Sequence, residues 1–176
     1  LIGKNYKTSL WEPFELKHKG IYRVEQNLYK NIYGNKLLFE EINHDLKIGF
    51  SYSWMNSEKY GFVRESRIFN LDNKHKIEVN LLDGLRNIMP YGVNRGLQAN
   101  MSTLVDGYKK CEVDDNTGLG IFTLSAILSD KAEPSEALKA TTVWQAGIEK
   151  PEILLSMDQF ENFSKGLPVT SEKNLK

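Results

Sequence analysis

The stretch FSYSW, residues 50–54, alternates large aromatic side chains with small polar ones. Successive side chains of an extended chain point to opposite faces, so Phe50, Tyr52 and Trp54 share one face and the two serines share the other. A strand with this period packs one face against a core and leaves the other half-buried. The fold prediction therefore begins from a β-strand at this position.

Similar β-rich runs flank this stretch and are separated by short polar turns, one of them at Gly34-Asn35. The predicted runs are 21–28, 37–42, 62–71 and 77–81. Strands that recur every ten to fifteen residues with polar turns between them indicate antiparallel pairing. Long helices do not alternate with these strands, which disfavours a parallel doubly wound sheet. We predict a mainly β protein, an antiparallel β-sandwich with one or two short helices.

The segment NLLDGLRNIMPYGVN, residues 80–94, contains an Asp-Gly pair between apolar residues. Asp83 and Gly84 both tolerate a positive φ angle, so the pair predicts a type I′ hairpin turn. This turn joins a strand ending at Leu82 to one starting at Leu85. Pro90 cannot donate a ladder hydrogen bond and is expected to end the second strand.

The second half of the chain adds two predicted helices. Apolar residues at helical spacing predict the first helix over 97–108. Ser156 and Gln159 form an S-x-x-Q capping box that predicts the start of the second, with Gly166 after its end. Further strands are predicted at 120–128, 138–144 and 152–155. We expect one domain over residues 1–168 and a flexible polar tail over 169–176.

The composition limits the class of protein and its partners. The chain has 176 residues, of which 40% are apolar and 26% are charged, as in a soluble globular domain. Lys plus Arg and Asp plus Glu each number 23, and this balance gives no support to nucleic acid as a partner. No apolar run approaches the roughly 18 residues that span a bilayer. A soluble protein of the cytoplasm or periplasm is expected, and its start at Leu1 suggests a processed or truncated end.

Cysteine, histidine, serine and acidic residues are present, but their spacing does not match a known catalytic or metal-binding motif. Cys111 is the single cysteine, which excludes an internal disulfide and a CxxC metal site. The three histidines, His18, His44 and His75, lie far apart, so no metal site is expected. Serine nucleophile motifs are absent, and no pair among the 23 acidic residues is selected by spacing. We therefore expect no catalytic residue, no metal and no cofactor in this chain.

Aromatic residues make up 11% of the chain and include Trp11, Trp54 and Trp144. Flat aromatic side chains serve as platforms in sugar-binding β-sandwiches, and sandwich cores are also rich in them. The sequence leaves both interpretations of each tryptophan open.

Several strings together resemble a known family. They are SLWEPFELKHKGIYRVEQNLYKNIYGNKLLFEEINHDL, YGFVRESRIFN, LLDGLRNIMPYGV and EPSEALKATTVW. Together they are similar to the N-terminal region of bacterial cellobiose-phosphorylase-like enzymes, the disaccharide phosphorylases formerly grouped as glycosyltransferase family 36. The resemblance covers roughly residues 9 to 165. It implies a β supersandwich, similar to galactose mutarotase, placed before an α/α-barrel that carries the catalytic acid.

The resemblance implies a function in carbohydrate metabolism. The chain would be the non-catalytic N-terminal domain of a glycoside hydrolase or phosphorylase, with the catalytic domain of the same parent chain as its partner. An oligosaccharide and a second copy of the chain are further expected partners. The candidate residues for a carbohydrate contact or a domain interface are Trp11, Trp54, Arg86, Asn87 and Tyr91.

Two alternatives stay open at this point. The first is a free-standing carbohydrate-binding module that uses exposed Trp11, Trp54 or Tyr91 as its platform. The second is a mutarotase-like epimerase, which needs a general acid and a general base around the anomeric carbon. For that chemistry His44 or His75 would have to converge with Glu40.

Overall fold

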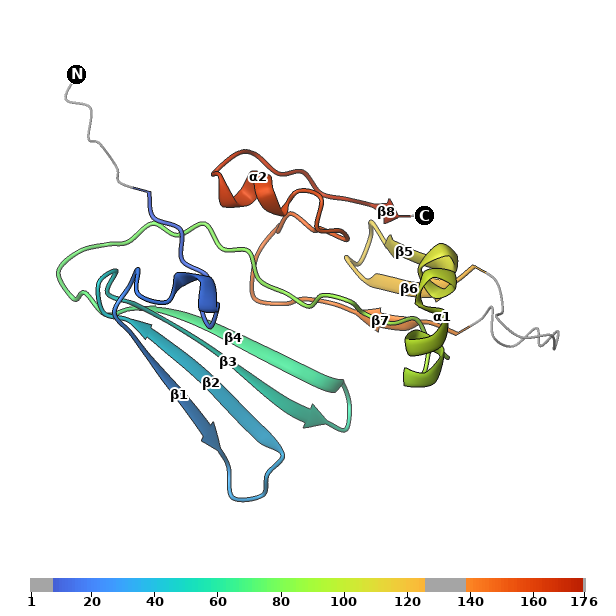
Figure 1. The fold of residues 1–176 in the computed structure, drawn as a ribbon, viewed down its shortest axis with the longest axis horizontal. Coiled ribbons are helices and arrows are strands. Elements are labelled where there is room, and N and C mark those ends of the chain that lie inside the picture. Colours follow the sequence, from blue (N-terminus) through green and yellow to red (C-terminus); the bar gives the residue numbers. More distant parts are fainter. Residues whose placement is uncertain (1–7, 126–138, 176) are drawn as a thin grey trace. The chain divides into compact units, whose positions relative to one another are not determined.

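The computed structural model describes residues 8–125 and 139–175, and Figure 1 shows their fold. The described chain forms two four-stranded antiparallel sheets, two short α-helices and one 3-10 turn. The expected fold class, mainly β with antiparallel sheets and one or two short helices, is confirmed. The chain divides into two compact units, Leu1–Asn80 and Leu81–Lys176, which are described separately. The prediction of a single domain over 1–168 stays a prediction.

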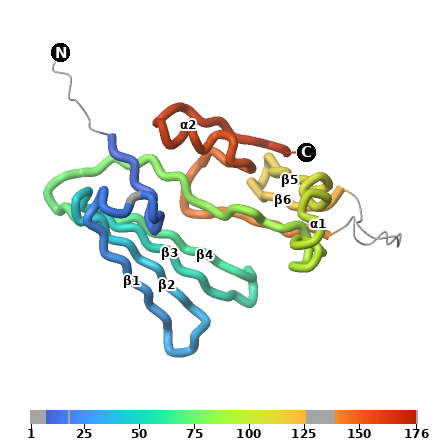
Figure 2. Tube along the Cα trace, in the orientation of Figure 1, coloured from blue at the N-terminus to red at the C-terminus, as the bar shows by residue number. Residues whose placement is uncertain are grey.

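The sheet of the first unit is a meander of four strands in chain order, visible in Figure 2. The strands are β1 (Val24–Lys30), β2 (Lys36–Asn43), β3 (Ile48–Ser57) and β4 (Gly61–Asn70), and the 3-10 turn η1 (Leu16–His18) precedes them. Gly34, with a φ of 70°, lies in the β1–β2 turn as predicted, where a left-handed residue favours glycine. The strands predicted at 37–42, 50–54 and 62–71 correspond to β2, β3 and β4 and are confirmed.

The register of this sheet separates its residues into two faces. Phe39 of β2 pairs with Tyr52 of β3, and Trp54 pairs with Arg64 of β4. We name the side that carries Phe50, Tyr52 and Trp54 the aromatic face, and the side that carries Ser51 and Ser53 the polar face. The two serines are 5% and 1% exposed, respectively. These short side chains lie between longer ones on the neighbouring strands, such as Glu40, Glu65 and Arg67.

The polar face also contains a close contact between an aromatic ring and the backbone. Phe69 of β4 pairs with Gly49 of β3, and a Cβ atom added to Gly49 would lie 2.2 Å from the Phe69 ring. The absence of a side chain at Gly49 therefore lets the ring pack directly on β3.

Residues 71–94, which follow β4, form neither strand nor helix. The predicted strand over 77–81 and the predicted hairpin turn at Asp83-Gly84 are therefore wrong. The alternation of Ile77, Val79 and Leu81 is present, but no strand within residues 8–125 and 139–175 pairs with it, and a strand requires a ladder of hydrogen bonds. Two residues of this segment are left-handed, Asn87 with a φ of 56° and Gly92 with a φ of 88°.

The second unit contains the helix α1 (Arg95–Tyr108) and a small sheet of order β7-β6-β5-β8. Its strands are β5 (Lys109–Val113), β6 (Gly120–Leu124), β7 (Thr141–Val143) and β8 (Asn174–Leu175). The helix predicted over 97–108 is confirmed. Asn94 caps it, because its Oδ1 accepts from the Leu97 backbone N–H at 2.8 Å. Val105 is completely buried.

Several predicted elements of the second unit differ from the structure. The strand predicted at 120–128 ends at Leu124, with residues 126–128 outside the described part, and the one at 138–144 is limited to Thr141–Val143. No strand forms at 152–155. The second helix, α2 (Phe160–Ser164), starts without a side-chain cap, so the predicted capping box is wrong. The Ser156 hydroxyl and the Gln159 amide both donate to Glu172 instead.

The segment expected to be a flexible tail has defined partners in the structure. The side-chain Oε1 of Gln159 accepts from the Thr170 backbone N–H at 2.8 Å, and the Glu152 carboxylate accepts from the Ser171 backbone N–H at 2.9 Å. Further on, Leu175 pairs with Cys111 of β5. Residues 170–175 are therefore integrated into the second unit.

Candidate functional site

The aromatic face of the first sheet is built from cross-strand rows of four residues. From β1 to β4, one row is Gln26, Glu41, Phe50 and Ile68. The next row is Leu28, Phe39, Tyr52 and Ser66, and the third is Lys30, Leu37, Trp54 and Arg64. Directly paired side chains on one face of an antiparallel sheet lie about 5 Å apart and contact each other. The rows therefore define which side chains of the aromatic face contact each other.

The segment before β1 covers the Phe50 row through a buried carboxylate. Glu41 is 3% exposed. Its Oε1 accepts from the Trp11 indole at 2.8 Å, and its Oε2 accepts from the Phe14 backbone N–H at 2.8 Å and the Gln26 amide at 2.7 Å. A buried carboxylate is tolerated only when such donors satisfy it. Glu41 therefore fixes the N-terminal segment, and Trp11 with it, to the sheet.

Tyr52 lies at the centre of the aromatic cluster. Phe14 meets its ring edge-on, with centroids 5.4 Å apart and an interplanar angle of 85°. Phe39 stacks on it with centroids 4.9 Å apart and an angle of 15°. The Arg64 guanidinium carbon lies 4.7 Å from the Tyr52 centroid, and one guanidinium nitrogen donates to the Ser66 hydroxyl at 2.7 Å. These contacts hold the guanidinium in a fixed orientation.

The aromatic face is open beyond the Tyr52 row. Phe62 is 81% exposed and Leu28 is 63% exposed, while Trp54 is half-buried. Phe62 pairs with Asn56 and is a diagonal neighbour of Trp54 on the same face. We name this surface the open half of the aromatic face and define it by Leu28, Lys30, Leu37, Trp54, Phe62 and Arg64. Its exposed apolar side chains, Leu28 and Phe62, make this surface a candidate interaction site.

The polar face carries His44 and Glu40, an imidazole and a carboxylate of the kinds that an epimerase would need, but these two side chains do not contact each other. His44 Nε2 lies 3.4 Å from a Glu25 carboxylate oxygen. Glu40 accepts from the Asn27 amide at 3.2 Å and from the Tyr29 hydroxyl at 3.4 Å. Asn27 also donates to Glu25, so His44 and Glu40 are connected only through two intervening side chains. The side chain of His18 lies outside what the structure describes.

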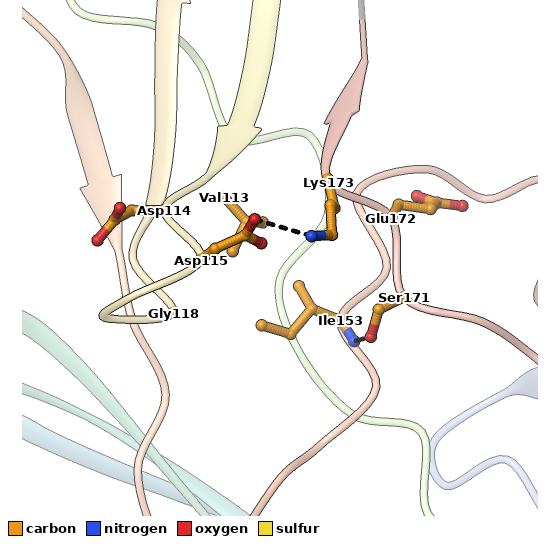
Figure 3. A pocket seen from close by; sticks show the side chains of 8 residues that line it. All are labelled: Val113, Asp114, Asp115, Gly118, Ile153, Ser171, Glu172 and Lys173. Atoms are coloured by element: carbon orange, nitrogen blue, oxygen red, sulfur yellow. Dashed lines mark hydrogen bonds and ion pairs between the residues drawn. The ribbon is translucent and has the colours of Figure 1, made fainter.

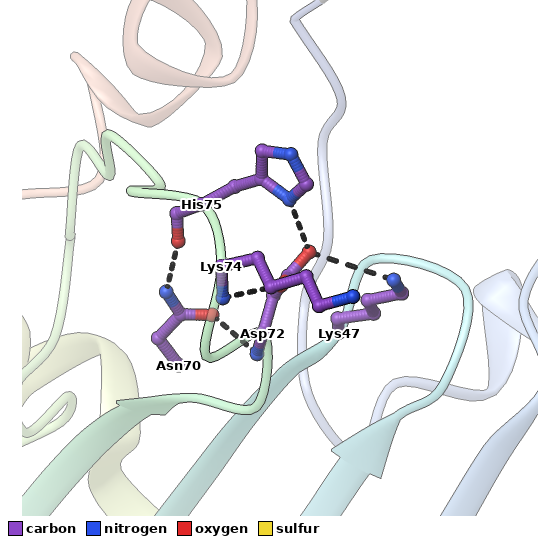
Figure 4. Close-up of polar contacts among 5 residues, drawn as sticks. All are labelled: Lys47, Asn70, Asp72, Lys74 and His75. Atoms are coloured by element: carbon purple, nitrogen blue, oxygen red, sulfur yellow. Dashed lines mark hydrogen bonds and ion pairs between the residues drawn. The ribbon is translucent and has the colours of Figure 1, made fainter.

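His75 belongs to a separate polar cluster after β4, shown in Figure 4. Its Nδ1 lies 2.9 Å from Oδ2 of Asp72, which is also 3.5 Å from the Lys47 ammonium. The Lys74 backbone N–H donates to the other Asp72 oxygen at 2.9 Å. The hydrogen bond from His75, with that from Lys74, holds the pKa of Asp72 well below its usual range. These contacts organise the turn that ends β4, and His75 is not among the partners of Glu40.

A small pocket of about 130 Å³ in the second unit is bordered by Asp115, Ile153, Ser171 and Lys173, as Figure 3 shows. The Lys173 ammonium donates to Asp115 at 2.7 Å. The Glu172 carboxylate accepts from the backbone N–H groups of Leu155 and Ser156 at 2.6 and 2.7 Å. Ligand sites usually enclose roughly 300–1,000 Å³, so this pocket is too small for a drug-sized ligand. Its polar groups hold the C-terminal segment in place.

The five predicted site residues divide between the two units. Trp11 and Trp54 lie on the aromatic face of the first unit, one bound to Glu41 and the other in the open half. Arg86, Asn87 and Tyr91 belong to the second unit and are exposed. The Lys139 ammonium lies 5.0 Å from the centroid of the Tyr91 ring.

Sequence reasoning missed Phe62 and Arg64, which share the aromatic face with Trp54. Phe62, Arg64, Ser66 and Ile68 are spaced two apart, so their common face could have been recognised. Their pairing with β3 could not, because it depends on the register that the turn at residues 58–60 sets.

Comparison with known proteins gives no family assignment: no family model matches the chain, and no curated protein matches it significantly. Within residues 8–125 and 139–175, no group of three or more His, Cys, Asp or Glu side chains could hold a metal ion. In that same part of the chain, every helix is too short or too polar to cross a membrane.

Proposed function

We propose that the chain is a non-catalytic β module of a carbohydrate-active enzyme and that the open half of the aromatic face is its contact surface. The observation that supports this proposal is that the N-terminal segment covers only one end of that face. The N-terminal segment covers the Phe50 row, whereas Phe62 stays exposed and Trp54 half-buried, four or more residues farther along β3 and β4. The resemblance of the chain to the N-terminal region of disaccharide phosphorylases supports the carbohydrate context.

The contact surface suits two occupants. The first is the catalytic domain of the same parent chain, for which the module would serve as a scaffold. The second is a carbohydrate, because the apolar face of a sugar ring stacks on flat aromatic side chains while polar neighbours bond its hydroxyl groups. Trp54 with Arg64 beside it in the same row supplies both features, which favours direct sugar binding as the second candidate function.

An assay of the purified 176-residue chain tests the non-catalytic part of the proposal. We expect neither hydrolysis nor phosphorolysis of gluco-, xylo- and malto-oligosaccharides, with or without inorganic phosphate. Turnover that persists after repurification would contradict the proposal. Polarimetry on freshly dissolved glucose and galactose tests the epimerase alternative, and we expect the spontaneous rate of rotation change to be unaltered.

Calorimetric titration tests sugar binding. We expect heat on titration with oligosaccharides, and its loss in Trp54→Ala. Trp144→Ala is the matched control, because Trp144 is 48% exposed and belongs to the other unit. Silence of the native chain at millimolar sugar would leave the scaffold role and remove the binding role.

A further inference from the structure

The two sheets differ in the length of their edge strands. The edge strands of the second sheet, β7 and β8, have three and two residues, whereas those of the first sheet, β1 and β4, have seven and ten. A long edge strand presents unpaired N–H and C=O groups that can pair with another strand. Six of the seven residues of β1 are exposed, compared with five of the ten of β4. The β1 edge is therefore the more accessible of the two.

The hydrogen bonds between β1 and β2 define which backbone groups of β1 point outward. Just before β1, the His44 backbone N–H donates to the Arg23 carbonyl at 3.0 Å. Just after it, the Asn31 backbone N–H donates to the Lys36 carbonyl at 3.2 Å. Bonded pairs alternate along an antiparallel ladder, so the odd-numbered residues of β1 bond to β2 and the even-numbered ones face away from the sheet. The outward-facing residues are Val24, Gln26, Leu28 and Lys30. Nowhere in the described part of the chain does another strand pair with this side of β1.

We infer that β1 pairs in antiparallel direction with β1 of a second copy of the chain, about a two-fold axis at Asn27, and so forms one eight-stranded sheet from two four-stranded ones. This register places Val24 opposite Lys30 of the second copy. It also places Gln26 opposite Leu28, so every outward-facing residue of the strand gains a partner within the strand. The four pairs exchange about eight backbone hydrogen bonds. An axis at Gln26 or Leu28 would place an outward-facing residue of β1 opposite a residue outside the strand.

The side chains of β1 suit this pairing, because like charges stay apart in it. The charged residues of the strand are Glu25 and Lys30. The two Glu25 carboxylates are four residues apart along the ladder, about 14 Å, and the two Lys30 side chains about 20 Å, which exceeds the Debye length of about 8 Å at physiological salt. Glu25 instead lies opposite Tyr29 of the second copy, whose hydroxyl can donate to a carboxylate. The pairing also covers Leu28, which is 63% exposed in the single chain.

The symmetry of the contact makes it a closed dimer. The same strand serves on both copies, so the contact is isologous and leaves no β1 edge free for a third chain. The two-fold axis is perpendicular to the sheet, and the aromatic faces of both copies therefore lie on the same side. A seven-residue strand pair buries less than the roughly 1,200 Å² of a standard interface. We therefore expect a weak dimer, with a Kd of about 10–100 µM.

Sedimentation velocity of the whole chain, from about 1 to 300 µM, measures this association. We expect the sedimentation coefficient to rise from that of a monomer to that of a dimer over this range. In Leu28→Pro we expect the Kd to rise at least about tenfold, because proline removes an outward N–H donor while the bonds to β2 remain. A native chain that stays monomeric at the highest concentration would overturn the inference.

Ile68→Pro is the matched control on the other edge strand. The Leu71 backbone N–H donates to the Lys47 carbonyl, so the alternation along β4 directs the Ile68 N–H outward as well. Ile68→Pro should leave the Kd unchanged. Equal weakening by Leu28→Pro and Ile68→Pro, or weakening by Ile68→Pro alone, would overturn the assignment to β1.

Cysteine cross-linking locates the axis without the proline variants. In the proposed pairing the Cα atoms of the two Asn27 residues lie about 4.5 Å apart, within reach of a disulfide, whereas those of Tyr29 lie about 14 Å apart. With oxidised glutathione, Asn27→Cys should form a covalent dimer at least about tenfold faster than Tyr29→Cys. Tyr29 is the more exposed residue, so random collision would give the opposite order. The native chain serves as the blank, because Cys111 is buried. Equal rates, or a faster reaction of Tyr29→Cys, would overturn the inference.

Discussion

Glu41 is the residue on which the covered end of the aromatic face depends. Replacing it with alanine leaves the Trp11 indole, the Phe14 backbone N–H and the Gln26 amide without their acceptor. Buried donors that lose a charged partner cost more than a typical hydrogen bond. We expect Glu41→Ala to lower the free energy of unfolding by about 2–4 kcal/mol. Urea unfolding followed by tryptophan fluorescence measures this change.

The adjacent residue supplies the control for this prediction. Glu40 lies on the polar face, is half-buried, and accepts longer hydrogen bonds of 3.2 and 3.4 Å. Glu40→Ala should cost less than about 1 kcal/mol. A similar loss in the two variants would show that the Glu41 clamp does not determine the stability of this face.

Asp72, in the turn after β4, makes the stability of the fold depend on pH. The hydrogen bond from His75, the backbone N–H of Lys74 and the nearby Lys47 ammonium hold the pKa of Asp72 below its ordinary value. A carboxyl with a lowered pKa in the folded state stabilises the fold above its unfolded pKa, near 4, and loses that contribution as the pH falls further. We expect the difference in unfolding free energy between the native chain and Asp72→Asn to be full at pH 6 and to diminish below pH 4.

Denaturant unfolding at pH 3, 4 and 6 measures this dependence. His75→Ala should reproduce part of the effect, because the hydrogen bond from His75 is the largest cause of the lowered pKa. A constant difference between the native chain and Asp72→Asn across this range would contradict the prediction.

At the scale of elements, two glycines respond oppositely to the same substitution. A methyl group at Gly49 would lie 2.2 Å from the Phe69 ring, so β3 and β4 would have to separate. We expect Gly49→Ala to destabilise the chain by about 1–3 kcal/mol. Gly107 lies in α1 with no atom within 4 Å of such a methyl group, and alanine favours helix. Gly107→Ala should stabilise it by up to about 1 kcal/mol, and thermal unfolding of both variants checks the signs.

The elements that the sequence predicts well are those with a strong local pattern. The period-2 alternation of residues 50–54 predicts β3, and the apolar spacing from Leu97 to Tyr108 predicts α1. The strand β5 was missed, because its sequence Lys-Lys-Cys-Glu-Val is mostly polar and is stabilised by pairing with β6 and β8. Pairing between distant segments is not encoded in local periodicity.

The reverse error has the same physical origin. Residues 77–81 alternate as a strand does but pair with no strand in the described part of the chain, and the pattern alone does not create a partner. At residues 156–159 the predicted capping box does not form, because the side chains of Ser156 and Gln159 both donate to the distant Glu172 carboxylate. Of the open half of the aromatic face, Trp54 was predicted, while Phe62 and Arg64 required the β3–β4 register.

At the scale of the whole molecule, the C-terminal segment differs between the sequence prediction, a flexible tail, and the structure, in which it has partners. A free tail could be removed without effect. In the structure, Glu172 binds the backbone of Leu155 and Ser156, and Leu175 pairs with β5. Deletion of residues 169–176 should therefore destabilise the second unit. Since these contacts all lie within Leu81–Lys176, the sheet of the first unit should keep its stability.

Hydrogen exchange of the truncated and full-length chains tests this prediction segment by segment. In the truncated chain we expect faster exchange in β5 and α2, and unchanged protection in β2 and β3, the two central strands of the first sheet. Glu172→Gln in the full-length chain should weaken the same contacts less, because the amide retains one acceptor oxygen. Equal protection in both chains would restore the interpretation of residues 169–176 as a free tail. Parallel loss in β2 and β5 would mean that the two units unfold as one cooperative domain, as the sequence predicts.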